Sequence, residues 1–210
     1  MKRIVLILVL MLPFISCSKS SKVTEEIIEY EINGILSLKI PPNFELKEEP
    51  KYKEVNNVRI LSYSDYELSE GIRFLTKGYE EPKSNNGGIK ITIVPLNPSD
   101  KLNIKDLTEE EIETLNDSHK AMYEDNYKDL NLKITKWIPL KKENVGGEFC
   151  LRTRYNVDGE GAVFSNGEMR AEEYLFMIND KSIEIIFTHC DSNNDLPKDF
   201  EKVVKSIKII

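Results

Sequence analysis

Long stretches in which apolar and polar residues alternate most constrain how this chain can fold. Every second residue of the segment 149–157 is Phe, Leu, Thr, Tyr or Val. Because successive side chains of a strand point to opposite faces, this pattern indicates a strand with one buried face. Strands are also expected at 169–178 and 182–190, with a turn at 179–181 between them. The last third of the chain is therefore predicted to form an antiparallel meander.

Shorter strands are expected in the first half of the chain. Residues 27–40 alternate on both sides of Asn33-Gly34, a dipeptide that favours a hairpin because both residues accept a positive φ. An extended piece is expected to start at 44–46, and further strands at 58–64, 72–76 and 89–94.

One long helix is expected at 108–127. Thr108 and Glu111 form a capping box, in which each side chain accepts a hydrogen bond from the other residue's backbone N–H. The apolar stripe is expected to carry His119 and to bury Ile112, Leu115 and Met122 against the sheet.

A shorter helix is expected to begin at Asp195 or Pro197, followed by a closing strand at 206–209. Strands therefore dominate, with helices inserted mid-chain and near the end. This order predicts an α+β domain built on a mostly antiparallel β-sheet.

The first sixteen residues have the pattern of an export signal. Lys2 and Arg3 precede an uninterrupted apolar run at 4–12, and a small Ser16 stands before Cys17. The apolar run is too short to span a bilayer, which takes about 20 residues. Phe14-Ile15-Ser16-Cys17 resembles the lipobox of bacterial lipoproteins, although Phe14 and Ile15 are bulkier than usual.

The lipobox resemblance implies that residues 1–16 are removed and that Cys17 carries the lipid. Each buried CH₂ contributes about 0.8 kcal/mol, and stable anchoring takes about two acyl chains. Residues 17–26 would then be the lipidated cysteine and a flexible tether. We expect an exported protein anchored through Cys17 in the bacterial envelope, at the outer membrane or the periplasmic face. An ordinary signal cleaved elsewhere and an uncleaved anchor are the alternatives.

Residues 27–210 are expected to form a single α+β domain. Charged residues make up 31% of the chain and hydrophobic residues 40%, as in ordinary globular domains. Loss of Lys2 and Arg3 with the signal lowers the formal net charge from −7 to −9. Because an acidic domain repels phosphate backbones, nucleic acid is not expected as a partner.

Three stretches resemble the PsbP-like superfamily, which includes the Ran-binding Mog proteins. They are the hairpin running into Ile40-Pro41-Pro42-Asn43-Phe44-Glu45-Leu46, the paired strands 174–176 and 183–187, and the ending 200–209. Their order matches across 27–210, with Phe44 where the family often has Trp. The resemblance implies an antiparallel sheet flanked by helices on both faces, an α/β/α sandwich. It also implies a binding or assembly role without catalytic residues.

Cys150 and Cys190 are predicted to be separate thiols, although exported proteins commonly contain disulfides. In a simple meander the strand 169–178 lies between their strands, which places them about 9–10 Å apart. A disulfide needs Cα atoms within about 7 Å. A different strand order would reverse this prediction.

The two histidines suggest catalysis or metal binding only weakly. His189 could act as a base for its neighbour Cys190, but adjacent strand residues point to opposite faces. We expect His189 to cap the edge of the core and His119 to be a hydrogen-bonded histidine on the helix. No zinc site, other metal site or cofactor is expected, because no ligands stand at suitable spacing around them.

The segment 191–195 resembles the start of a calcium loop. However, Leu196 occupies the position of the required Gly, and Lys202 replaces the final Glu. A polar turn with Asp195 near the N-terminus of the last helix is expected instead.

Three further features are expected to be structural. Glu109-Glu110-Glu111 suits the first turn of a helix, where the dipole favours carboxylates. The loop containing Gly159 and Gly161 lacks a phosphate-binding pattern. Trp137 is expected to lie in the core.

The sequence favours a non-enzymatic binding or assembly module without specifying its ligand. An envelope protein or a small ligand is expected to contact the sheet edge or the loops 80–88 and 158–168, since loops of this length often carry function. Cys17 is the one site residue predicted, and no catalytic or cofactor-binding residue is. A hydrolase whose site forms only in the fold, and a purely structural envelope protein, are the alternatives.

Overall fold

The computed structural model of the chain describes residues 27–47, 50, 52–78, 86–158, 168–190 and 195–210. Several predictions fall outside these ranges. They concern the signal 1–16, Cys17 and the tether 17–26, most of the loops 80–88 and 158–168, Gly159 and Gly161, and residues 191–194 of the calcium-like segment.

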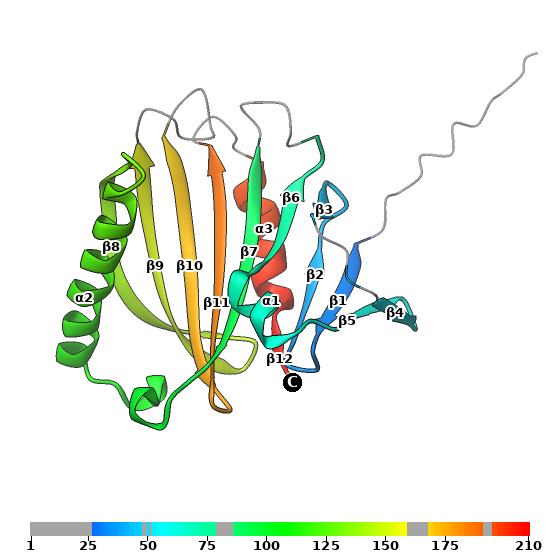
Figure 1. Ribbon diagram of the computed structural model, residues 1–210, viewed down its shortest axis with the longest axis horizontal. Helices are drawn as coiled ribbons and strands as arrows, with labels where there is room; N and C mark the ends of the chain where they lie inside the picture. Colours follow the sequence, from blue (N-terminus) through cyan, green and yellow to red (C-terminus); the bar gives the residue numbers. More distant parts are fainter. Residues whose placement is uncertain (1–26, 48–49, 51, 79–85, 159–167, 191–194) are drawn as a thin grey trace, which may run out of the picture.

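A seven-stranded antiparallel sheet forms the centre of the fold, in the order β3-β6-β7-β11-β10-β9-β8 (Figure 1). Its strands are β3 (Phe44–Leu46), β6 (Ile72–Thr76), β7 (Gly87–Pro95), β8 (Lys133–Val145), β9 (Glu148–Asp158), β10 (Met169–Ile178) and β11 (Lys181–Cys190). Strands β9, β10 and β11 are neighbours in sequence order, which confirms the predicted meander.

A second sheet of five strands has the order β12-β2-β1-β5-β4. Its strands are β1 (Ile28–Ile32), β2 (Leu36–Ile40), β4 (Tyr52–Val55), β5 (Val58–Leu61) and β12 (Lys208–Ile209). Asn33 and Gly34 have φ values of 50° and 64° and join β1 to β2, which confirms the predicted hairpin. Strand β5 pairs with β1 in parallel, whereas the other pairs of this sheet are antiparallel.

Helices cover both faces of the larger sheet, and the predicted α+β class is confirmed. Helix α2 (Glu109–Lys128) lies on one face, and α3 (Leu196–Ser206) lies with the smaller sheet on the other (Figure 1). On the α3 side, Phe187 packs on Phe200 with ring centroids 5.0 Å apart. Every described helix and strand falls between Ile28 and Ile209.

The start of α2 agrees with the prediction, and its buried face agrees in part, because Ile112 and Leu115 pack against the sheet as expected. Thr108 and Glu111 form the expected capping box. Met122, expected to be buried, is 46% exposed, and Tyr123 takes the buried position beside it. A helix turns about 100° per residue, so Asn116 and Tyr123 lie beside Leu115 and His119 on the face that contacts the sheet.

The strand expected at 58–64 is shorter than predicted, because a helix starts within it. Strand β5 ends at Leu61, and α1 (Asp65–Glu70) follows. Ser64 caps α1 through a second capping box with Glu67.

Candidate ligand-binding groove

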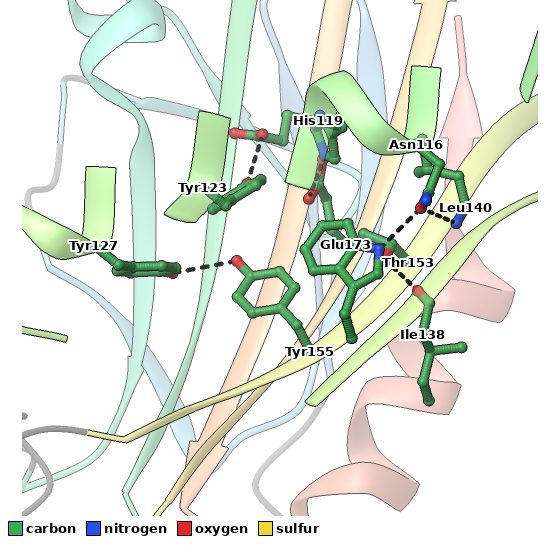
Figure 2. Close-up of polar contacts among 11 residues, drawn as sticks. Asn116, His119, Tyr123, Tyr127, Ile138, Leu140, Thr153, Tyr155 and Glu173 are labelled. Carbon is green, nitrogen blue, oxygen red and sulfur yellow. Dashed lines mark hydrogen bonds and ion pairs between the residues drawn. The ribbon is translucent and has the colours of Figure 1, made fainter. Parts of the chain in front are cut away.

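Polar and aromatic side chains gather where α2 lies on the larger sheet (Figure 2). Helix α2 supplies Asn116, His119, Tyr123 and Tyr127, and the sheet supplies Trp137, Thr153, Tyr155, Glu173 and Glu184. The strand register explains why the sheet residues meet. Tyr155 is aligned with Trp137 on β8 and with Ala171 on β10, while Glu173 is aligned with Thr153.

His119 and Glu173 form a buried ion pair across the interface between α2 and the sheet. His119 Nε2 lies 2.9 and 3.0 Å from the two carboxylate oxygens of Glu173, whose exposed fraction is 1%. Burial lowers the pKa of His119, but the hydrogen bond to Glu173 and the negative charges of Glu173 and Glu184 outweigh it and raise that pKa. His119 is therefore a hydrogen-bonded histidine, as expected from the sequence.

A second carboxyl group, that of Glu184, lies beside this pair. The Tyr123 hydroxyl donates a hydrogen bond of 3.2 Å to Glu184. Burial, and then the charge of Glu173, raise the pKa of Glu184, while Tyr123, Lys90 and His119 act in the opposite direction. Partners on α2 and β7 thus stabilise the negative charges of Glu173 and Glu184.

Asn116 connects α2 to the edge strand β8. Its Oδ1 accepts hydrogen bonds from Trp137 Nε1 at 2.8 Å and from the backbone N–H of Leu140 at 3.0 Å (Figure 2). The Thr153 hydroxyl donates to the carbonyl oxygen of Ile138, where the ladder between β8 and β9 is irregular. These bonds fix both the helix and the irregular strand.

Aromatic rings fill the space between these polar contacts. Trp137 stacks on Tyr155 with centroids 5.5 Å apart and an interplanar angle of 19°. Tyr123 packs on Tyr155 at 5.0 Å, and the hydroxyl groups of Tyr127 and Tyr155 lie 3.3 Å apart. Trp137 packs against this apolar cluster, as expected.

A groove of about 570 Å³ opens beside the cluster, between the second half of α2 and strands β6, β7 and β11. Its apolar lining comes from Leu75, Met122, Leu130, Met169 and Ile186, and Tyr123, Tyr127 and Tyr155 form an aromatic wall. Such a volume lies within the range of small-molecule sites. Arg73, Lys90 and Glu184 are the charged residues of the lining among the residues that the structure describes.

Cys150 and Cys190 are both buried and free, as predicted. Strand β10 lies between their two strands. Phe176 of β10 is aligned with Cys150 on one side and with Ile183 of β11 on the other. Cys190 is therefore offset by about 23 Å along the strands. Burial raises the pKa of Cys150 to about 12 and also raises that of Cys190, which makes both thiols poor nucleophiles.

The other predicted residues lie outside the groove. The His189 ring packs near Phe200, on the face of the sheet opposite to Cys190, so the two are not a catalytic pair. Glu109, Glu110 and Glu111 occupy the first turn of α2, as expected. Asp195 stands at the start of α3, but its side chain makes no capping hydrogen bond.

The described residues contain neither a metal-binding cluster nor a membrane-spanning helix. No three His, Cys, Asp or Glu side chains in the described ranges are grouped so that they could hold a metal ion. No helix in this part of the chain is both long enough and apolar enough to cross a membrane.

No family model matches the chain, and no curated protein matches it. Among solved structures it is similar to cyanobacterial PsbP (CyanoP) from Synechocystis sp. PCC 6803, with 14% identity, a TM-score of 0.45 and coverage of 94% of this chain and 99% of that one. It is also similar to the Saccharomyces cerevisiae Ran-binding protein Mog1p, with 12% identity, a TM-score of 0.45 and coverage of 88% and 96%.

A Bacteroides thetaiotaomicron VPI-5482 protein is similar at 12% identity and a TM-score of 0.43. That match covers 83% of this chain but 45% of the Bacteroides chain. At such identities and scores, the likenesses concern the arrangement of strands and helices alone.

Proposed function

We propose that this protein is a lipid-anchored envelope protein whose domain binds an elongated, largely apolar small molecule in the groove beside α2. The observation that carries the proposal is the groove itself, with about 570 Å³ of space, apolar and aromatic walls, and a few charged groups. Sites for small molecules commonly combine a mostly apolar lining with a small number of polar groups that orient the ligand.

The titratable residues next to the groove support binding rather than hydrolysis. His119 is engaged with Glu173, and Glu184 accepts a hydrogen bond from Tyr123. These contacts hold α2 on the sheet, so the side chains that could act as acid or base instead determine the shape of the groove.

The anchoring part of the proposal rests on the export signal and on Cys17. Strand β1, which follows the predicted tether, lies at the other end of the molecule from α2 (Figure 1). An anchor attached ahead of β1 is therefore compatible with an accessible groove.

Metabolic labelling with a clickable fatty acid tests the anchor. The wild-type protein is expected to carry the label and to fractionate with membranes, and Cys17→Ser is expected to lose both properties. A label that persists in Cys17→Ser would refute lipidation at this residue.

Equilibrium dialysis with lauryl alcohol tests the groove, using the chain from Ser18 onward, which contains every described helix and strand. Met122 and Leu130 at the rim are 46% and 64% exposed, so Met122→Ser/Leu130→Ser should fold normally. Losing two apolar contacts is expected to weaken binding about tenfold.

A matched control is Ile27→Ser/Ile210→Ser, which removes two apolar side chains of similar exposure, 55% and 57%, away from the groove. This variant is expected to bind like the wild type. Equal weakening in the two double variants would show that lauryl alcohol binds elsewhere on the surface and would contradict the proposal.

A further inference from the structure

Two cationic side chains stand next to each other at one edge of the groove. Arg73 of β6 and Lys90 of β7 are directly aligned in the antiparallel ladder, which places their Cβ atoms about 4.5–5.5 Å apart. Like charges in this arrangement are destabilising unless an anion lies between or above them. We infer that the groove selects an amphipathic anion, with a fatty-acid carboxylate bound by Arg73 and Lys90; this inference rests on the proposed function.

The charged side chains that line the groove are mainly cationic, and Arg73 also borders a neighbouring pocket lined by Glu67 and Glu70. The side chain of Arg73 makes no salt bridge or hydrogen bond with any residue in the described ranges. Lys90 interacts electrostatically with Glu184, and Glu184 also accepts a hydrogen bond from the Tyr123 hydroxyl. The groove therefore has two cations and one compensated carboxyl group, in a chain whose net charge is −7.

The floor of the groove gives the ligand its direction. A row of aligned residues crosses five strands: Leu75, Gly88, Thr188, Ala171 and Tyr155. All of them except buried Ala171 line the groove. Neighbouring strands are about 4.8 Å apart, so this row is about 19 Å long. A long, narrow ligand suits it better than a compact one.

Small residues leave space for a ligand above the middle of this row. Gly88 and Ala171 lie between the larger side chains of Leu75 and Tyr155. A Cβ atom at Gly88 would lie 2.9 Å from Leu75 Cδ2, so a larger residue there would push Leu75 away.

The two ends of the row differ in character, which sets the orientation of the ligand. Arg73 and Lys90 lie at the β6 and β7 end, whereas Met169 and Tyr155 lie at the β10 and β9 end. The carboxylate is expected at the first end, and the alkyl chain is expected to run toward the second beneath α2. Exposed Met122 and Leu130 would then cover the chain from the helix side.

Three probes with the same alkyl chain test this inference by equilibrium dialysis near neutral pH: laurate, lauryl alcohol and laurylamine. Laurate is expected to bind about tenfold more tightly than the other two, because its carboxylate can accept charge-assisted hydrogen bonds from Arg73 and Lys90. Arg73→Gln/Lys90→Gln is expected to abolish this preference, because laurate should then bind no more tightly than lauryl alcohol does to the same variant.

Lys53→Gln/Lys205→Gln is the control, because it removes two exposed lysines far from the groove and should retain the preference. Circular dichroism and thermal unfolding of each variant separate loss of binding from loss of structure. A second pair, Met122→Glu and Met122→Gln, differs only in charge at the rim. The Glu variant is expected to bind laurate several-fold more weakly than the Gln variant.

Each result has a defined consequence. Binding of none of the three probes overturns both this inference and the proposed function. Equal binding of the three probes overturns the charge selectivity, but the groove remains a binding site. Tightest binding of laurylamine also overturns the inference and assigns the polar head to Glu184.

Discussion

Replacing Asn116 by Ala is expected to lower the free energy of unfolding by about 2–4 kcal/mol. Asn116 is buried on α2, and its Oδ1 accepts hydrogen bonds from Trp137 Nε1 and the Leu140 backbone N–H. A donor that loses its partner in a buried place costs about 1–3 kcal/mol. Trp137 is only partly buried, so water can replace part of its bond, whereas the N–H of buried Leu140 stays without a partner.

Helix propensity works against this loss without cancelling it. Ala is a better helix former than Asn by at most about 0.7 kcal/mol, so the unpaired donors dominate. For a domain of this size, 1 kcal/mol corresponds to about 2–4 °C, and the melting temperature of Asn116→Ala should fall by about 5–15 °C.

Urea unfolding followed by circular dichroism measures the effect. Glu113→Ala, an exposed position nearly one turn away on α2, is expected to change the unfolding free energy by less than about 0.5 kcal/mol. A double-mutant cycle of Asn116→Ala with Trp137→Phe should give a coupling energy of about 1 kcal/mol. A coupling near zero, or a loss no larger than that of Glu113→Ala, would refute the role given to Asn116.

Two further predictions concern pH and backbone conformation. The pKa values of His119 and Glu184 are raised in the folded state, so the stabilisation is present below their unfolded-state pKa values and is lost as pH rises through the raised ones. Urea unfolding should therefore show lower stability as pH rises above about 6.5, the ordinary pKa of histidine, and His119→Gln should flatten this part of the profile. Gly146 has φ +64°, and a Cβ there would collide with the carbonyl oxygen of Ile207, so thermal unfolding should show Gly146→Ala to be more destabilising than Gly147→Ala, which meets open space.

The elements that the sequence predicts correctly are those with local signals. The Asn33-Gly34 turn, the Thr108 capping box and the alternation of β9, β10 and β11 each need only neighbouring residues. Helix α1 has the same kind of signal in Ser64 and Glu67, so the sequence could have revealed it.

Strand β8 and the division into two sheets depend on less local features. Register shifts between Ile134 and Lys136 and between Ile138 and Lys141 interrupt the alternation that would mark β8. The parallel pairing of β1 with β5 joins segments about thirty residues apart, and no local pattern specifies it.

The candidate site was missed because its carboxylates look like surface residues. Glu184 stands between Ile183 and Ile185 on β11, as a solvent-facing residue does, and Glu173 follows another glutamate on β10. Their face is buried because α2 lies on it, and that docking brings His119 and Tyr123 to them. The sequence pattern also predicted that Met122 is buried, whereas its neighbour Tyr123 is the buried residue.

The polar contacts beneath α2 determine where the helix sits, and therefore how wide the groove is. Asn116 and Tyr123 are the buried residues of α2, and its apolar residues Ile112 and Leu115 are only partly buried, so apolar burial alone specifies its position poorly. The bonds of Asn116 to β8 and of His119 to Glu173 are directional and hold the helix over β8, β9 and β10. Because this leaves β6 and β7 uncovered, ligand binding and helix docking should be coupled. Asn116→Ala should then weaken laurate binding as well as stability, although Asn116 does not line the groove.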